Sequence, residues 1–151
     1  MPKSLRLFIT VTDVLFILYW TMAALSELNL LTIPRELMYA DYDNPRVVAW
    51  NWSFFPLDIV FSLVGLAAVC ASNKGHQCWR PLALISLTLT MTAGGMAVSY
   101  WAILGEFDPS WFIPNLLLVI WPLFFLRQLV AGMSLVALGT DKVSDSLNKQ
   151  L

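Results

Sequence analysis

The sequence predicts an all-α integral membrane protein, a bundle of four membrane-spanning helices with both termini in the cytoplasm. Of its 151 residues, 58% are hydrophobic and only 13% are charged, whereas soluble domains carry about 25% charged residues. Four apolar stretches are each long enough to cross a hydrocarbon core, which takes about 20 residues of helix. The net charge of -1 and the absence of a basic stripe exclude a nucleic-acid-binding role.

The predicted spans cover residues 5–28, 53–72, 81–104 and 111–138. We interpret the first as a retained span rather than a cleaved signal peptide, because Asp13 interrupts it and its apolar run is long for a signal. The fourth has its apolar core at 111–126 and continues toward residue 138. Residues 1–139 therefore form one transmembrane domain, and residues 140–151 a polar, frayed cytoplasmic tail.

The orientation follows from the positive charges in the short connections. Seven of the nine lysines and arginines fall on one side of the predicted spans: Lys3, Arg6, Lys74, Arg80, Arg127, Lys142 and Lys149. Cytoplasmic segments carry the excess of basic residues. We therefore expect a multi-pass protein of the cell membrane, with residues 29–51 and 105–110 outside.

The first span carries Asp13, Trp20 and Glu27 at seven-residue spacing, which places them on one helix face. We expect Asp13 to be a hydrogen-bonded interior acid that faces another helix. Glu27 lies near the outer boundary of the span. It is either an interfacial residue that hydrates there or part of a binding site.

The long outer connection at 29–51 lacks glycine and is rich in large side chains, so we expect it to lie on the interface as a cap. Its large side chains include Leu37, Met38, Tyr39, Tyr42 and Trp50, and Trp52 follows directly after it. The alternative is an ordinary aromatic belt at headgroup depth. The spacing of its acids does not fit a calcium loop.

The second span contains Asp58, one to two turns below the outer surface, after Pro56 in the first turns. An ionisable group within a span costs at least ~2.5–3.5 kcal/mol and marks a functional site by default. The alternative is a neutral acid that is hydrogen-bonded for structure alone. The loop after this span contains His76 between Cys70 and Cys78, which is too loose a set of ligands to predict a metal site.

The third span repeats small residues at four-residue spacing, with Ser86, Thr90 and Gly94 in one row and Gly95 and Ser99 in another. Small residues let helix backbones approach closely, so this span is expected to be central in the bundle. The same surface is a candidate for homo-oligomerisation. The two glycines could instead leave room for a ligand.

The fourth span contributes Asn115 near its outer end and Pro122 in its middle, where a proline kinks a helix. Glu27, Asp58, Tyr100 and Asn115 thus come from four spans at one depth. Polar groups that converge under an aromatic cap describe a binding cavity. The predicted site therefore consists of these four residues with Trp50 and Trp52.

This layout resembles the EXPERA superfamily, which includes the emopamil-binding sterol isomerase and the sigma-two receptor. In that group an acid ends the first span, a proline-containing loop follows, and an acid lies early in the second span. Glu27, residues 33–37 and residues 53–61 match this pattern. The chain also looks like the small uncharacterised bacterial YvaD-type membrane proteins. The sterol isomerases use a histidine, but His76 lies on the wrong side for that chemistry.

Together these features predict a protein that binds a hydrophobic or cationic amphiphilic small molecule, such as a lipid or a sterol-like compound, between its helices. Glu27 and Asp58 would contact the polar part of the ligand. No cofactor and no metal are expected, and catalysis is left open. The alternative is a subunit of a proton or cation transporter or channel, in which Asp13 and Asp58 bind the proton or cation in turn. A third possibility is a non-catalytic accessory subunit of a membrane complex.

Overall fold

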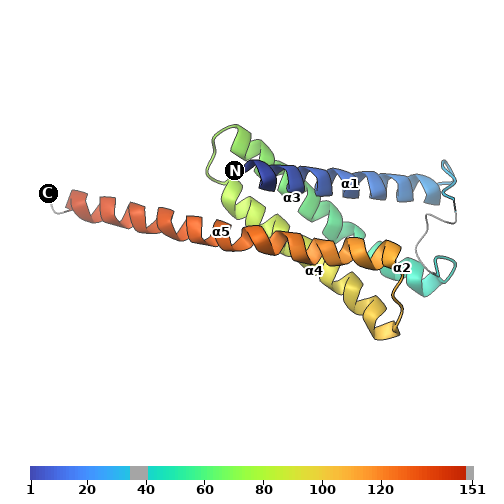
Figure 1. Ribbon diagram of the computed structural model, residues 1–151. Coiled ribbons are helices and arrows are strands. Elements are labelled where there is room, and N and C mark those ends of the chain that lie inside the picture. Colours follow the sequence, from blue (N-terminus) through green and yellow to red (C-terminus); the bar gives the residue numbers. More distant parts are fainter. Residues whose placement is uncertain (35–40, 149–151) are drawn as a thin grey trace.

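A computed structural model describes residues 1–34 and 41–148, with the side chains of residues 133–148 left out of the description. Every described element is a helix, as the sequence predicts (Figure 1). The helices are α1 (Lys3–Glu27), α2 (Pro45–Ser53), α3 (Phe55–Asn73), α4 (Trp79–Leu104) and α5 (Pro109–Asn148). The prediction of an all-α fold is confirmed.

Four segments are long and apolar enough to cross a membrane: Lys3–Glu27, Pro45–Asn73, Trp79–Leu104 and Pro109–Gly132. Their mean hydropathy lies between 1.6 and 2.1. Large apolar side chains also cover the outer surface, including Leu7, Ile103 and Phe124, the last of them 70% exposed. An apolar exterior of this extent is what a lipid environment requires, so the four predicted spans are confirmed.

Helix α2 is the element that the sequence analysis missed, because it lies at the end of the long connection. It begins at an Asn-Pro pair, where the Asn44 side chain accepts a hydrogen bond from the Arg46 backbone N–H at 3.0 Å. Proline at the first helical position and asparagine before it both favour a helix start. Phe54 then joins α2 directly to α3, so the second membrane segment begins at Pro45 rather than at residue 53. The residues of the predicted cap at 35–40, among them Leu37, Met38 and Tyr39, lie outside the described residues.

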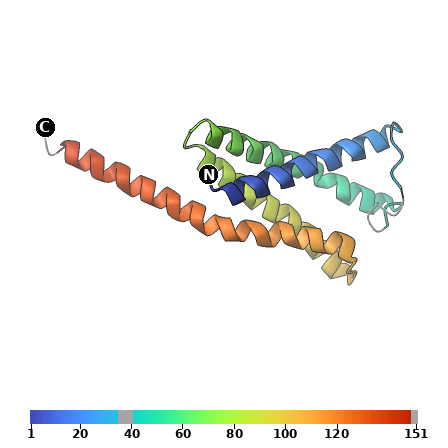
Figure 2. The same cartoon turned by 45° about the horizontal axis from the view of Figure 1, so that its top comes forward.

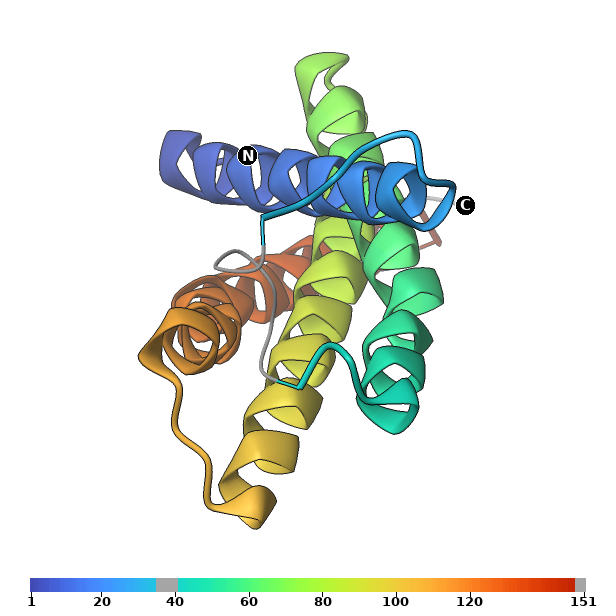
Figure 3. The same cartoon turned by 90° about the vertical axis from the view of Figure 1, so that its right-hand side faces the viewer.

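Helix α4 is central, as its small residues predict. It packs against both α3 and α5, and α3 packs in turn against α1, so the helices contact each other in the order α1, α3, α4, α5 (Figures 2 and 3). A Cβ atom at Gly94 would lie 2.6 Å from the Asn115 carbonyl oxygen of α5, whereas one at Gly95 would meet nothing within 4 Å. Gly94 therefore serves close packing. The row of Ser86, Thr90 and Gly94 is buried against other helices of the same chain. Only Gly95 and Ser99 of these small residues are left for a contact with a second copy.

Helix α5 continues through Pro114 and Pro122 without a break (Figure 1). It also runs on to Asn148, so the expectation that the helix frays beyond residue 139 is wrong. The segment after Gly139 contains no proline and includes good helix formers, and a single glycine costs a helix only about 1 kcal/mol.

The bundle has two distinct ends (Figure 1). The chain begins at one end, where the α3–α4 connection also lies, and we call this the N-terminal end. The opposite end carries α2 and the α4–α5 connection, and we call it the α2 end. The last part of α5 extends past the N-terminal end, so residue 148 and the N-terminus lie on the same side of the four spans.

The buried hydrophobic residues form three clusters, of which the smallest is Val47 of α2 with Trp101 of α4. The cluster toward the N-terminal end is mainly aliphatic: Leu5, Ile9, Ala68, Ala83, Leu87, Trp121 and Leu129. The cluster toward the α2 end is mainly aromatic: Trp20, Phe54, Phe61, Ala93 and Ala97. Among the side chains that the structure describes, the buried polar residues are Asp13, Asp58, Ser62, Ser86 and Thr90, and both acids lie inside the bundle.

Candidate functional site

The candidate site is a cavity of about 320 Å³ in the α2 half of the bundle. It is lined by α1, α2, the start of α3, the second half of α4 and the start of α5, and its walls are mostly apolar and aromatic. Ligand cavities typically hold about 300–1,000 Å³ and combine apolar walls with a few polar groups. The polar residues among its lining are Thr12, Tyr19, Asn51, Asp58, Ser110 and Asn115.

Asp58 provides the acid of this cavity. It lies in the first turn of α3, and its side chain is only 3% exposed. The Trp20 indole N–H of α1 donates a hydrogen bond to Asp58 Oδ2 at 3.0 Å. Asp58 Oδ1 is buried and has no hydrogen-bond partner. The carboxyl is therefore anchored through one oxygen and has its second oxygen available.

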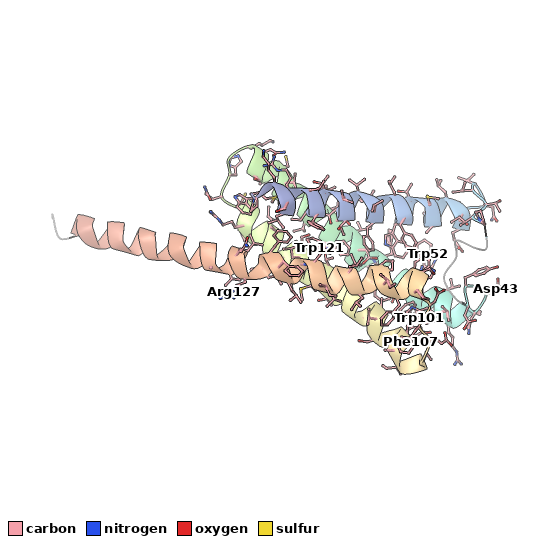
Figure 4. All side chains as sticks on the ribbon, viewed as in Figure 1. Asp43, Trp52, Trp101, Phe107, Trp121 and Arg127 are labelled. Carbon is pink, nitrogen blue, oxygen red and sulfur yellow. The ribbon has the colours of Figure 1, made fainter. Side chains whose placement is uncertain are left out.

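Aromatic rings from α1 and α2 surround the cavity at the α2 end. The Trp20 ring lies 5.3 Å from that of Trp52, and Trp50 stacks on Tyr100 at 4.1 Å. Figure 4 shows Trp52 and Trp101 on this half of the molecule and Trp121 nearer the N-terminal end. Tryptophan and tyrosine combine a large apolar surface with a polar tip, which suits a site that receives a partly polar ligand.

The predicted site residues do not all meet in this cavity. Asp58, Asn115 and Trp50 line it, whereas Tyr100 lies behind Trp50 and lines neither of the two cavities described. The remaining pair, Glu27 and Trp52, line a smaller cavity of about 220 Å³ beside it.

The register of α1 explains this separation. Trp20, rather than Glu27, stands level with Asp58, and Glu27 follows seven residues later, about 10 Å further along the helix. Tyr19, Asn51 and Trp111 line both cavities, and the Tyr19 hydroxyl donates to Asn51 Oδ1 at 3.1 Å. These residues form the partition between the two cavities.

Sequence analysis did not identify Trp20 as the partner of Asp58, nor Tyr19 and Asn51 as lining residues. The seven-residue spacing of Asp13, Trp20 and Glu27 did mark the correct face of α1. Deciding which of the three stands opposite Asp58 requires the vertical offset between α1 and α3. A single sequence does not contain that offset.

The cavity reaches the outer surface between α1 and α5. Leu15 of α1 lines it and is 59% exposed, and Pro114 of α5 also lines it and is exposed. The two helices meet through ring contacts on either side of these residues. Phe8 stacks on Trp121 with centroids 5.3 Å apart, and Tyr19 lies 6.3 Å from Trp111.

The two ring contacts limit the size of this opening. Phe8 and Tyr19 are eleven residues apart, about 16 Å along α1. Their partners Trp121 and Trp111 are ten residues apart, about 15 Å along α5. The opening is therefore bounded at both ends by aromatic rings and faces sideways out of the bundle.

The start of α5, which carries Trp111 and Pro114, is held by Asp108. The Ser110 backbone N–H and hydroxyl donate to Asp108 Oδ1 at 2.9 and 2.7 Å, and these bonds hold the pKa of the Asp108 carboxyl below its usual value. The Asp108 carbonyl oxygen accepts from the Phe112 N–H at 2.8 Å. This arrangement caps the free N–H groups at the helix start.

Asp13 lies outside the cavity, near the middle of the bundle, and is 1% exposed. It faces α3, as the sequence predicts. A Cβ atom at Gly65 of α3 would lie 2.0 Å from Asp13 Oδ2 and 2.7 Å from Ser86 Oγ of α4. Gly65 therefore leaves the space that the carboxyl occupies. The expected hydrogen bond is missing at one oxygen, because Asp13 Oδ2 has no partner.

Among the residues that the structure describes, no group of three or more histidine, cysteine, aspartate or glutamate side chains is placed to hold a metal ion. Cys70 and Cys78 are exposed free thiols.

Comparison with known proteins identifies relatives without a known activity. The model of a family of unknown function, DUF5360, matches residues 5–135. An uncharacterised protein of Bacillus subtilis (strain 168), YvaD, is 42% identical over 128 residues, which cover 85% of this chain and 92% of that protein. The expected likeness to YvaD-type proteins is thus confirmed. No solved structure matches the chain.

Proposed function

The chain belongs to DUF5360, a family of unknown function, and for this member we propose a role in binding a cationic amphiphile within the membrane. The polar, positively charged part of the ligand lies beside Asp58, and its apolar part lies between α1 and α5. The ligand is a membrane lipid or another hydrophobic small molecule that enters from the bilayer. The proposal includes no catalytic step.

The observation that carries this proposal is a buried carboxyl in an otherwise apolar and aromatic cavity. Asp58 has one oxygen bonded to Trp20 and the other without a partner. A cation beside that oxygen would complete its interactions, and burial of an acid without such compensation is costly. Trp20 and Trp50 also line the cavity, and an aromatic ring attracts an ammonium or guanidinium group that lies over its face.

The sideways opening supports entry from the bilayer. A ligand that lies in the cavity can extend its chain past Leu15 and Pro114 into the surrounding lipid. The cavity of about 320 Å³ then needs to accommodate only the head and the first part of that chain. Single-chain amphiphiles fit this arrangement best.

The resemblance to the EXPERA superfamily agrees with such a ligand and stays a prediction. His76 lies in the connection between α3 and α4, at the N-terminal end, away from the cavity. A histidine-dependent isomerisation of the kind found in the sterol isomerases is therefore not part of the proposal. We further propose that the protein resides in the cell membrane with both termini in the cytoplasm.

The test uses the tryptophans of the cavity as reporters. The full chain in lipid nanodiscs is titrated with an alkyltrimethylammonium compound that carries bromine on its chain, and quenching of tryptophan fluorescence is measured. Trp20, Trp50, Trp101 and Trp111 all line the cavity. The Asp58→Asn variant should bind this compound about tenfold more weakly or worse, because it removes the negative charge that attracts the quaternary ammonium group. Unit charges about 4 Å apart interact by about 4 kcal/mol at an effective dielectric constant of about 20, and a loss of about 1.4 kcal/mol is tenfold in affinity.

Three controls separate the roles of charge and space. Glu27→Gln removes an acid outside this cavity and should leave binding unchanged. An uncharged brominated amphiphile of the same chain length should bind wild type and Asp58→Asn equally. Ala97→Leu fills the cavity and should weaken binding of both compounds. Equal affinity of wild type, Asp58→Asn and Ala97→Leu for the cationic compound would contradict the proposal.

A further inference from the structure

Two buried acids lie inside the bundle without a buried base. Among the residues whose side chains are described, the buried polar ones are Asp13, Asp58, Ser62, Ser86 and Thr90. None of these five carries a positive charge. An ionised carboxylate within a membrane span is costly unless a positive charge lies beside it. The basic residue on the same face of α1 is the half-buried Arg6, seven residues and about 10 Å before Asp13, which is too far for an ion pair. A charge directly beside either acid would therefore have to come from a bound proton or ion.

The polar residues form a row along the contact between α1 and α3. Asp58, Ser62 and Gly65 follow each other at spacings of four and three residues, which places them on one face of α3. Trp20 of α1 bonds to Asp58 at one end of the row, and Asp13 of α1 lies against Gly65 at the other. The row is about 10 Å long, at 1.5 Å per residue.

Three atoms in this row are buried and have no hydrogen-bond partner: Asp58 Oδ1, Ser62 Oγ and Asp13 Oδ2. Buried polar side-chain atoms are nearly always paired, and exceptions call for a bound water or ion or a functional role. Arg6 Nε and Trp121 Nε1 are also buried without a partner, but these three atoms lie together along the contact between α1 and α3. All three are oxygen atoms, which are the ligands that protons and hard cations take.

We propose that Asp13, together with Ser62 and Ser86, forms an occluded site for one monovalent positive charge, carried by a proton or by an alkali metal ion. The site is reached from the cavity by way of Asp58. The aliphatic cluster around Leu5, Ile9 and Leu87 closes it toward the N-terminal end. The proposal does not depend on the presence of an amphiphile in the cavity.

Gly65 gives the site its space. Asp13 Oδ2 and Ser86 Oγ both lie within 2.7 Å of the position that a Cβ atom of Gly65 would take, so the carboxyl and the hydroxyl approach each other over the bare α3 backbone. Any side chain at residue 65 would displace them. A glycine at this position brings oxygen atoms from α1 and α4 together, in addition to bringing the helices close.

The surroundings of Asp13 contain one other titratable group that can respond to pH. On α3 the buried acid is Asp58, and on α4 the buried residues are uncharged. The buried residues of α5 that the structure describes are Trp121, Pro122 and Leu129, which do not titrate. On α1 itself the buried residues besides Asp13 are Leu5, Ile9 and Trp20.

The first arm of the experiment tests for a metal ion. The melting temperature of the purified full chain is measured at fixed pH while sodium or lithium chloride replaces N-methylglucamine chloride at constant ionic strength. A bound ion stabilises the folded state as its concentration rises above its dissociation constant. The expected result is a saturable rise for wild type and Glu27→Gln, and none for Asp13→Asn.

The second arm tests for a proton. Infrared spectra of the wild type at neutral pH are recorded in H2O and D2O. A proton on Asp13 should give a carboxylic C=O band that shifts on deuteration and is absent from Asp13→Asn.

Ser62→Ala covers the case in which Asp13→Asn does not fold. It should shift the frequency of the C=O band if a proton is bound, or raise the half-saturating ion concentration several-fold if a metal ion is bound. An ionised Asp13 in the infrared spectrum without any ion-specific stabilisation would overturn the proposal. An Asp13 response that Ser62→Ala leaves unchanged would remove Ser62 from the site.

Discussion

The two halves of the bundle interior are built from different side chains and have different consequences. In the N-terminal half, small and aliphatic residues such as Ala68, Ala83 and Leu87 are completely buried. In the α2 half, the buried residues are mainly aromatic, and both cavities described above lie there. Small and branched side chains interdigitate to high density. Large flat rings meet edge to face, as Phe16 and Phe61 do, and aromatic residues line both cavities.

Packing and binding therefore belong to different halves of the bundle: the N-terminal half is tightly packed, and the α2 half contains the cavities. Helix α4 contributes to both halves, with Ala83 in the first and Ala97 in the second. The alanines are chemically identical, but one lies against neighbouring side chains and the other lines the cavity. The same substitution at the two positions therefore measures the difference directly.

The largest effect is expected for Ala83→Leu. Added methylene groups in a well-packed core cost about 1–3 kcal/mol, and Ala83 is completely buried. Ala97→Leu, which places the same side chain toward the cavity, should cost less than about 1 kcal/mol. Reversible unfolding in mixed micelles gives both values. Equal costs would show that the α2 half is as tightly packed as the other.

The second prediction concerns Gly65, between the two halves. Gly65→Ala should destabilise the fold by about 1–2 kcal/mol, because overpacking costs about 1–3 kcal/mol and the gain in helix propensity offsets up to about 1 kcal/mol of it. Gly95→Ala is the matched control, since a Cβ there meets nothing within 4 Å. It should be neutral or stabilising. Thermal melts of the two variants and wild type provide the measurement, and a stable Gly65→Ala variant would contradict the close approach of Asp13.

A smaller effect is expected for Trp20→Phe in the aromatic half. The change keeps an aromatic ring but removes the indole N–H that donates to Asp58. Hydrogen bonds between membrane helices average about 0.6 kcal/mol and reach about 1.7 kcal/mol. The cost should fall in that range and should largely disappear in an Asp58→Leu background, which has no acceptor for the indole N–H, whereas Asp58→Asn keeps an amide oxygen that can accept it. A double-mutant cycle measures this coupling, and strict additivity would separate the two residues.

The smallest effect is a pH dependence at the start of α5. The Asp108 carboxyl has a lowered pKa in the folded state because Ser110 donates two hydrogen bonds to it. The stabilisation is therefore fully present above the unfolded-state pKa and is lost as the pH falls through the folded-state pKa. Asp108→Asn should flatten the acid side of the stability profile slightly. An identical profile for wild type and variant would show that the cap contributes nothing measurable.

The candidate site was predicted in part. Asp58 and Asn115 were expected in a cavity from their depth in the spans, and Trp50 was expected there as part of the aromatic cap; all three line one cavity. Glu27 was expected beside Asp58, but it lines a neighbouring cavity and Trp20 takes its place. Depth was estimated by counting residues from the end of each span. That count does not include the offset between neighbouring helices, which shifts α1 by about two turns relative to α3.

The sequence by itself determined the number of spans, the burial of Asp13 and Asp58 and the central position of α4. Each of these follows from local composition, because apolar length decides membrane insertion and small residues decide how closely a helix can be approached. The tertiary structure alone decided that Gly65 makes room for Asp13, that Trp20 bonds to Asp58 and that α1 and α5 stand apart beside the cavity. These outcomes depend on how the helices rotate and shift against one another, and a change of one residue in register turns a side chain by about 100°.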